Sequence, residues 1–204
     1  MIKNIVFDLG AVLIDWNPRY LYRKIFFAKK EMEYFLTNIC TPEWNSRADA
    51  GESFEKICAE LAQKYPAYKE QIALYYTRWE EMLGGSIAQT VQILRELKAK
   101  NFPVFALTNW STQTFPLARR KFPFLNEFNG VVVSGEEKLL KPDPRLYLIL
   151  LERYKLKAEE SVFIDDNPAN VEAASSIGFN AIRFTSPKEL RAKLQNISKG
   201  LEII

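Results

Sequence analysis

Three short apolar runs along the chain each stop at a polar residue. Four apolar or nearly apolar residues between polar flanks are typical of a strand buried on both faces of a sheet. A segment with helical periodicity follows each run, so the pattern predicts repeated strand–helix units and a parallel sheet. Ligands bind such sheets at the carboxyl ends of the strands, so these polar residues are expected to share one crevice. The runs and the residues that follow them are Asn4–Phe7 with Asp8, Val104–Leu107 with Thr108, and Ser161–Ile164 with Asp165 and Asp166.

The segment from residue 16 to residue 85 has a different pattern. Apolar residues recur at helical spacing throughout it, and the strand–helix alternation resumes only after Gly84-Gly85. We therefore predict an α/β fold, in which residues 1–15 and 86–204 form a doubly wound parallel sheet with its helices. Residues 16–85 are expected to be a small helical cap inserted into it. Its two connections, residues 16–18 and Gly84-Gly85, are the predicted hinges of a lid.

The remaining elements follow the same alternation. Further strands are expected at Val131–Val133 and Ala181–Phe184, because both are short apolar runs. Most of the helices are expected to begin at a proline, which suits the first helical turn. The predicted helix starts are Ser111, Pro144, Pro168 and Pro187.

Composition narrows the possible functions. A formal net charge of +3 falls short of the basic stripe that nucleic-acid binding requires. The absence of histidine excludes Ser-His and Cys-His catalysis and histidine-ligated zinc. No apolar stretch reaches the roughly 18 residues of a membrane span, and Asp8 lies too near the amino terminus for a signal peptide, so a cytoplasmic protein is expected. Nothing indicates a protein partner, and catalysis is left to carboxylates, lysine, hydroxyls or an oxygen-bound metal.

Asp165 and Asp166 are the strongest local signal for chemistry. Two adjacent carboxylates beside a third, Asp8, repel one another unless a positive charge lies between them. Magnesium binds carboxylate and phosphate oxygens, so the cluster predicts a Mg²⁺ site. The alternative is that Asp166 or Asn167 caps the helix that starts at Pro168.

Two further segments carry groups suited to phosphate. Asp8 at a strand tip is a competent nucleophile for an aspartyl-phosphate, although it is also compatible with a simple turn. Thr108 and Asn109 offer a hydroxyl, an amide and backbone N–H groups at a helix start, or alternatively a helix cap. Lys141 lies between stiffening prolines in Lys141-Pro142-Asp143-Pro144, which fixes its direction better than that of an ordinary exposed lysine.

Together these segments resemble the four ordered motifs of the haloacid dehalogenase-like hydrolase superfamily. The resemblance covers essentially the whole chain, and residues 16–85 fall where that family inserts a helical cap into its Rossmann-like core. Any one motif is weak, whereas four in this order and spacing are specific. The segments are Asp8-Leu9-Gly10-Ala11-Val12, Leu107-Thr108-Asn109, Lys141-Pro142-Asp143-Pro144 and Ile164-Asp165-Asp166-Asn167.

The resemblance implies a role for each matching position. Asp8 would be the nucleophile and a magnesium ligand, and Gly10 would offer its backbone carbonyl to the metal. Asp166 would be a direct ligand, and Asp165 would bind directly or through water. Thr108, Asn109 and Lys141 would hold the transferring phosphoryl group and offset its charge.

One departure from the family pattern concerns Gly10. Phosphatases of the family usually carry a second aspartate there as general acid and base, whereas its dehalogenases place a bulky aromatic residue there and lack the paired acids. This chain has neither side chain but keeps Asp165-Asp166, which resembles the subgroup of bacterial sugar-1-phosphate phosphatases. Without an acid, turnover is expected to rise steeply with leaving-group acidity, unless Asp15 or Asp49 supplies the proton.

We therefore predict a magnesium-dependent phosphatase that acts on a small phosphorylated metabolite, a sugar phosphate, through phospho-Asp8. The alternatives are a metal-independent 2-haloacid dehalogenase and a catalytically weak sugar-phosphate-binding or regulatory protein. Trp44, Arg47 and Trp110 are the candidate substrate contacts, because a ring wall with hydrogen-bonding neighbours suits a sugar. Packing within the cap explains Trp44 almost as well.

Overall fold

The centre of the protein is a sheet of five parallel strands. The computed structural model describes residues 1–197, and its strand order is β5-β4-β1-β6-β7. Every neighbouring pair in this sheet is parallel, so all five carboxyl ends lie at one edge, as predicted. The strands are β1 (Asn4–Phe7), β4 (Val104–Thr108), β5 (Gly130–Val133), β6 (Ser161–Asp165) and β7 (Asn180–Arg183).

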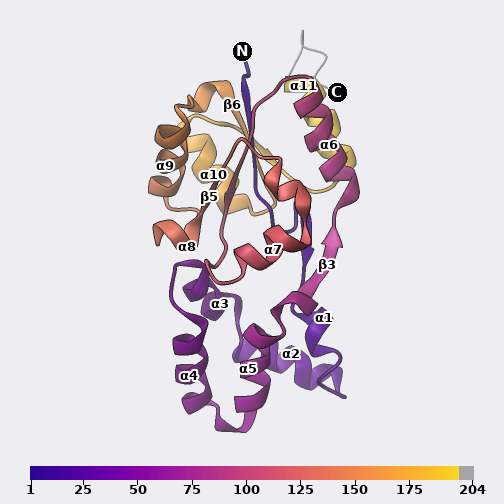
Figure 1. The fold of residues 1–204 in the computed structure, drawn as a ribbon, viewed down its shortest axis with the longest axis vertical. Helices are drawn as coiled ribbons and strands as arrows, with labels where there is room; N and C mark the ends of the chain where they lie inside the picture. Colours follow the sequence, from indigo (N-terminus) through magenta and orange to yellow (C-terminus); the bar gives the residue numbers. More distant parts are fainter. Residues whose placement is uncertain (198–204) are drawn as a thin grey trace.

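Helices cover both faces of the sheet, with α6 and α11 on one side and α9 and α10 on the other (Figure 1). Alternation along β1 separates two cores, because Ile5 and Phe7 pack towards α6 and α11 whereas Val6 packs towards α9. Burial on both faces accounts for the uninterrupted apolar runs of the central strands. The helical elements of the core are α6 (Ala88–Ala99), α7 (Phe115–Lys121), η3 (Pro123–Asn126), α8 (Ser134–Glu137), α9 (Pro144–Tyr154), η4 (Ala158–Glu160), α10 (Pro168–Ile177) and α11 (Pro187–Ile197).

A second, all-helical unit lies at the end of the sheet where the strands terminate (Figure 1). It packs around an aromatic cluster in which the Tyr22 and Phe35 ring centroids are 4.8 Å apart and Tyr75 lies against Tyr22. Burial of these rings supplies much of its apolar core. Its elements are α1 (Arg19–Tyr22), α2 (Lys29–Asn38), α3 (Pro42–Asp49), α4 (Phe54–Lys64), η1 (Pro66–Tyr68), α5 (Lys69–Thr77) and η2 (Trp79–Met82).

The connection between the two units differs from two bare hinges. β2 (Ile14–Trp16) and β3 (Leu83–Ser86) pair as a short antiparallel ribbon, so both crossings run side by side. A Cβ atom at Gly84 would collide with Asp15 Oδ2, so a larger residue there would require the Asp15 side chain to move. The expected start of a helix at Ser111 is wrong, since residues 111–114 form a turn and α7 begins at Phe115. Within residues 1–197, no helix is both long and apolar enough to cross a membrane.

Candidate active site

The strand order brings the predicted polar residues together. β1 lies between β4 and β6, and Phe7 is in register with Ala106 on one side and Ile164 on the other. Asp8 therefore follows β1 at the same level as the ends of its two neighbours, and its backbone N–H donates to Ile164 O at 2.8 Å. One carboxylate oxygen from each of Asp8, Asp165 and Asp166 lies within 4.8 Å of the others.

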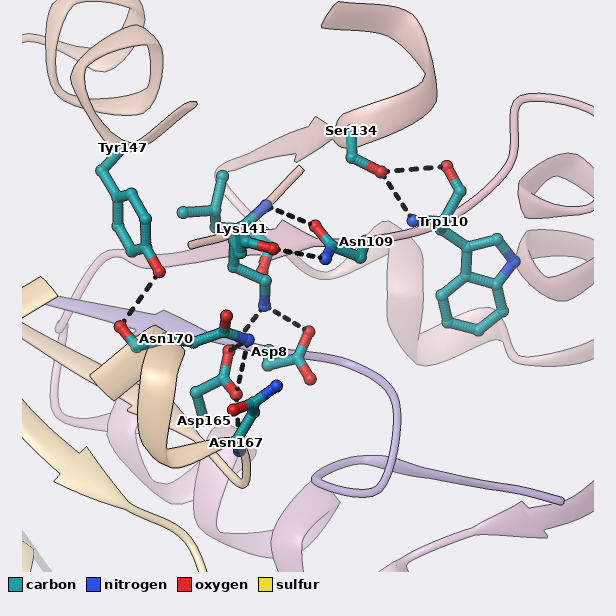
Figure 2. A network of polar contacts seen from close by, with 10 residues as sticks. Asp8, Asn109, Trp110, Ser134, Lys141, Tyr147, Asp165, Asn167 and Asn170 are labelled. Carbon is teal, nitrogen blue, oxygen red and sulfur yellow. Dashed lines mark hydrogen bonds and ion pairs between the residues drawn. The ribbon is translucent and has the colours of Figure 1, made fainter. Parts of the chain in front are cut away.

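Lys141 reaches into this carboxylate cluster from the loop before α9 (Figure 2). Its ammonium donates to Asp8 Oδ1 at 2.8 Å and to Asp165 Oδ2 at 2.6 Å. A third bond goes to the carbonyl oxygen of Leu107 at 2.8 Å. The side chain is buried, so each charge-assisted bond is shielded from solvent and fixes the orientation of Asp8.

Asn109 holds the backbone of Lys141 in place. Its Oδ1 accepts from the Lys141 N–H at 2.8 Å, and its Nδ2 donates to the Lys141 carbonyl at 3.0 Å (Figure 2). Both ends of the amide are thus used to join the β4 tip to the Lys141 loop. The phosphate-binding role of the Asn109 side chain stays a prediction, whereas its positioning of Lys141 is visible in these two bonds.

Asp165 and Asp166 have different surroundings. Both oxygens of Asp165 accept bonds, from Lys141, from the Asn167 N–H at 2.9 Å and from Asn170 Nδ2 at 3.0 Å. Tyr147 in turn donates its hydroxyl to the Asn170 carbonyl at 3.0 Å. Asp166 is exposed at the cavity described below. Asp165 is therefore arranged to hold Lys141, and Asp166 is the more available ligand for a cation.

The electrostatics of the cluster favour a bound cation. Burial raises the pKa of Asp8 to about 7; Asp165 and Asp166 add to the rise and Lys141 opposes it. Burial also raises the pKa of Asp166, with Asp165 contributing. For Lys141, burial alone would lower the pKa, but Asp8 and Asp165 outweigh it and the net direction is upward. Three carboxylates against one ammonium leave two excess negative charges (3 − 1), which a hard divalent ion would offset.

A cavity of about 220 Å³ lies beside the cluster, between the core and the helical unit. Aromatic rings form much of its wall, and polar groups lie among them, the combination that is usual in small-molecule sites. The core contributes Gly10, Ala11, Asn109, Trp110, Thr114 and Asp166, and the other wall consists of Trp16, Asn45, Asp49, Phe54 and Trp79.

Comparison with known proteins identifies the family. A family model described as haloacid dehalogenase-like hydrolase matches residues 2–178. The chain belongs to the haloacid dehalogenase-like hydrolase family. The family, the α/β fold and the hydrolase class predicted from the sequence are confirmed.

Relatives of this hydrolase include phosphatases. It is 28% identical over 189 residues to the sesquiterpene phosphatase astK of Aspergillus oryzae, and the matched segment covers 90% of each of the two chains. It is 27% identical over 186 residues to a phosphorylated carbohydrates phosphatase of Thermotoga maritima, covering 88% of this chain and 83% of the relative. A Pseudomonas (S)-2-haloacid dehalogenase is 29% identical over only 93 residues, 46% of this chain and 41% of the dehalogenase.

Solved structures share the whole fold. A HAD-like family hydrolase from Porphyromonas gingivalis matches with a TM-score of 0.74 and 25% identity, covering 98% of this chain and all of that one. A HAD family enzyme from Bacteroides thetaiotaomicron, in complex with magnesium and inorganic phosphate, matches with a TM-score of 0.68 and 22% identity over 91% of this chain and 95% of that one.

The predicted substrate contacts lie in different places in this hydrolase. Trp110 lines the cavity, but Trp44 and Arg47 are not among the described residues that do so. Trp44 is buried in the cap, where Nε1 donates to the Ile57 carbonyl at 3.2 Å and the ring packs edge-on against Tyr75. Arg47 pairs with Glu52 and Glu60, each at 2.7 Å. The substrate role of Trp44 and Arg47 stays a prediction, and these contacts account for both residues without it.

The sequence predicts Asn45 and Asp49 as hydrogen-bonding neighbours of Trp44, with Asp49 also a possible proton donor. It predicts Phe54 only as part of an apolar helical stripe, yet all three residues line the cavity. The helical spacing within α3 carried a signal, because Trp44 and Ala48 share its buried face. Asn45 and Asp49, also four residues apart, share a different face, and both line the cavity. A pair of polar residues beside the buried face of a helix indicates a binding site only when the segment that packs against the polar pair is known.

Direct hydrogen bonds fix the cap against the core. Ser134 Oγ donates to the Asp49 carbonyl at 2.6 Å and accepts from the Trp110 N–H at 2.9 Å. Gln113 Oε1 accepts from the backbone N–H of Phe54 at 2.7 Å. The two ends of the segment from Asp49 to Phe54 are thereby held on the core loops that border the cavity.

Proposed function

We propose that this hydrolase is a magnesium-dependent phosphatase that acts on a small phosphorylated metabolite, a sugar phosphate, through an aspartyl-phosphate on Asp8. The observation that carries the proposal is the buried Asp8 carboxylate, which Lys141 orients beside a cavity large enough for a small molecule. A fixed carboxylate next to an ammonium group is suited to attack on phosphorus, since the charge transferred to the phosphoryl oxygens is offset where it develops.

The donor set fits magnesium. Carboxylates of Asp8 and Asp166 would supply hard oxygens, and Gly10, whose backbone carbonyl would be a further ligand, lines the cavity beside them. Asp165, which accepts bonds from Lys141 and Asn170, would position Lys141 and would bind the ion directly or through water. When bound, the ion would neutralise phosphoryl oxygens that face the carboxylates.

The chain's own residues then divide the reaction into two steps. Asp8 attacks phosphorus, the bond to the leaving oxygen breaks, and the phosphoryl group is carried on Asp8. Water next attacks the same phosphorus and releases phosphate, which restores the Asp8 carboxylate. The Lys141 ammonium offsets negative charge in both steps, and Thr108 with the neighbouring amides contributes hydrogen bonds to the phosphoryl oxygens.

The residues that line the cavity suit a sugar phosphate. Trp16, Phe54, Trp79 and Trp110 line the cavity with aromatic side chains that would pack against the apolar part of a sugar, and Asn45 lines it with an amide group suited to a hydroxyl group. The volume of about 220 Å³ favours a leaving group of a few carbons. The phosphorylated carbohydrates phosphatase of Thermotoga maritima is consistent with this choice.

The direct test is a screen of phosphorylated metabolites, with phosphate release measured in magnesium and in chelator. We expect magnesium-dependent release, abolished in Asp8→Asn, whose isosteric amide is not nucleophilic. Beryllium trifluoride with magnesium is expected to bind at Asp8 of the wild type as a mimic of the phosphorylated state. Chelator-resistant halide release from 2-chloropropionate would replace the proposal with a dehalogenase, and binding without turnover would replace it with a binding protein.

A further inference from the structure

Because Gly10 has no side chain, this position on the loop after β1 cannot donate a proton to the leaving group. A Cβ atom at Gly10 would meet nothing within 4 Å, so the glycine creates open space where a side-chain acid would otherwise stand. Protonation of the leaving oxygen is typically worth about 10²–10⁴-fold in rate, which makes another donor worth seeking in the same cavity.

Among the described residues that line the cavity, two are titratable, Asp49 and Asp166. Asp166 belongs to the carboxylate cluster that suits a cation. Asp49 comes from the other unit, at the last turn of α3, and its carbonyl is anchored to the core by Ser134. A cavity of about 220 Å³ has the volume of a sphere about 7.5 Å across, so an acid on its wall is within reach of a leaving oxygen bound there.

The surroundings of the Asp49 carboxyl group suit a proton donor. Asn45 Nδ2 donates to Oδ2 at 3.1 Å, and the Ser111 backbone N–H also donates to the carboxylate. Burial and the Ser111 bond are the causes that set the pKa of Asp49, and no cationic side chain is among them. Tyr75 in α5 is the titratable group that interacts electrostatically with Asp49, and it stays neutral because burial raises its pKa well above 10. Burial likewise raises the pKa of Asp49 to about 7, and Ser111 opposes the rise only in part.

Asp15, the other acid near the cap connection, is placed differently. Its Oδ2 accepts from the Tyr20 hydroxyl at 2.7 Å, and its carboxylate lies against Gly84 within the β2–β3 ribbon. It is not among the residues that line the cavity. Asp15 therefore serves as a matched control for a carboxyl group of the same type outside the site.

We propose that Asp49 is the general acid and base of this enzyme, supplied by the cap in place of the side chain that Gly10 lacks. The inference rests on the proposed phosphatase function. As Asp8 bonds to phosphorus, the breaking bond leaves its electron pair on the leaving oxygen, which takes the proton of Asp49. In the second step the Asp49 carboxylate takes a proton from the water that attacks phosphorus, and Asp8 departs as carboxylate.

The test compares p-nitrophenyl, phenyl and benzyl phosphate, whose leaving groups become steadily less acidic, with magnesium present throughout. In the wild type we expect a shallow dependence of kcat/KM on leaving-group acidity. Asp49→Asn is expected to lower turnover of benzyl phosphate by about 10²–10⁴-fold and that of p-nitrophenyl phosphate by less than about tenfold. Asp15→Asn is expected to keep the wild-type pattern.

The outcomes separate the two proposals. Equal losses on all three substrates, or no loss, would overturn the role of Asp49 while leaving the phosphatase intact. A steep dependence in the wild type would overturn it as well, and this measurement holds even if the variant does not fold. Absence of phosphate release from every substrate, with no phosphorylated Asp8, would overturn the phosphatase function and this role together.

Discussion

Replacement of Lys141 by methionine tests the electrostatic account of the site. Methionine is unbranched like lysine but apolar, so the change removes the ammonium group from between Asp8 and Asp165 while it largely keeps the packing of the side-chain stem. Removing one partner of a buried ion pair typically costs about 3–5 kcal/mol, because the remaining charge is left without compensation. Here two carboxylates lose the same partner, so we expect the full cost when both are ionised.

The cost must depend on pH in a defined direction. Burial already raises the pKa of Asp8 to about 7, and loss of Lys141, which opposes that rise, moves it further upward. A carboxyl group whose pKa is higher in the folded state is most stabilising below its unfolded value of about 4, and that contribution is lost as the pH rises through the folded value. The destabilisation by Lys141→Met is therefore expected to be smaller near pH 5 than at pH 8, where it reaches about 3–5 kcal/mol.

Urea unfolding of both proteins at pH 5 and pH 8, without magnesium, measures this difference. Adding Asp8→Asn to Lys141→Met removes one unpaired charge, so the double variant is expected to be more stable at pH 8 than the single variant. An equal loss of stability at both pH values would mean that Lys141 contributes packing and not charge, which would contradict the electrostatic role of its ammonium group.

Three further variants test separate parts of the account. Asp166→Ala is expected to abolish the response of phosphate release to magnesium, as a chelator does in the wild type; retained magnesium dependence would remove Asp166 from the metal site. The free energy of unfolding of Asp49→Asn, measured in urea, is expected to rise relative to that of the wild type by up to about 4 kcal/mol between pH 4 and pH 8, because the pKa of Asp49, raised to about 7, makes its ionisation costly in the folded wild type; a constant difference across that range would contradict this role of Asp49. Arg47→Met is expected to lower kcat/KM for a sugar phosphate and for p-nitrophenyl phosphate equally and slightly, since its partners are the half-buried Glu52 and the exposed Glu60 and neither lines the cavity; a loss specific to the sugar phosphate would show that Arg47 contacts the substrate.

The central strands and their polar ends could be predicted because burial on both faces leaves a strong sequence signal. β1, β4 and β6 lie at Asn4–Phe7, Val104–Thr108 and Ser161–Asp165, where the apolar runs indicated them. The β2–β3 ribbon gave no such signal, because each strand is short and one contains two glycines. Its pairing depends on a contact between residues some 70 positions apart, which no local pattern encodes.

The candidate site also has one part that could be predicted from the sequence and one part that could not. Topology alone places Asp8, Thr108 and Asp165 at one edge of the sheet, so their meeting could be predicted without side-chain detail. The cap wall depends on how α3 docks, and that docking exposes Asn45 and Asp49 to the cavity while it buries Trp44. A tryptophan in a polar segment draws attention as a possible ligand contact, yet its large apolar surface is equally well satisfied by packing.

The most direct test of the central claim is mass spectrometry of the Asp8 peptide after a single turnover of p-nitrophenyl phosphate with magnesium, quenched in acid. We expect a phosphoryl group on Asp8 in the wild type, and none in Asp8→Asn. Release of phosphate without any phosphorylated Asp8 peptide would contradict it, because the carboxylate that Lys141 orients would then not be the nucleophile.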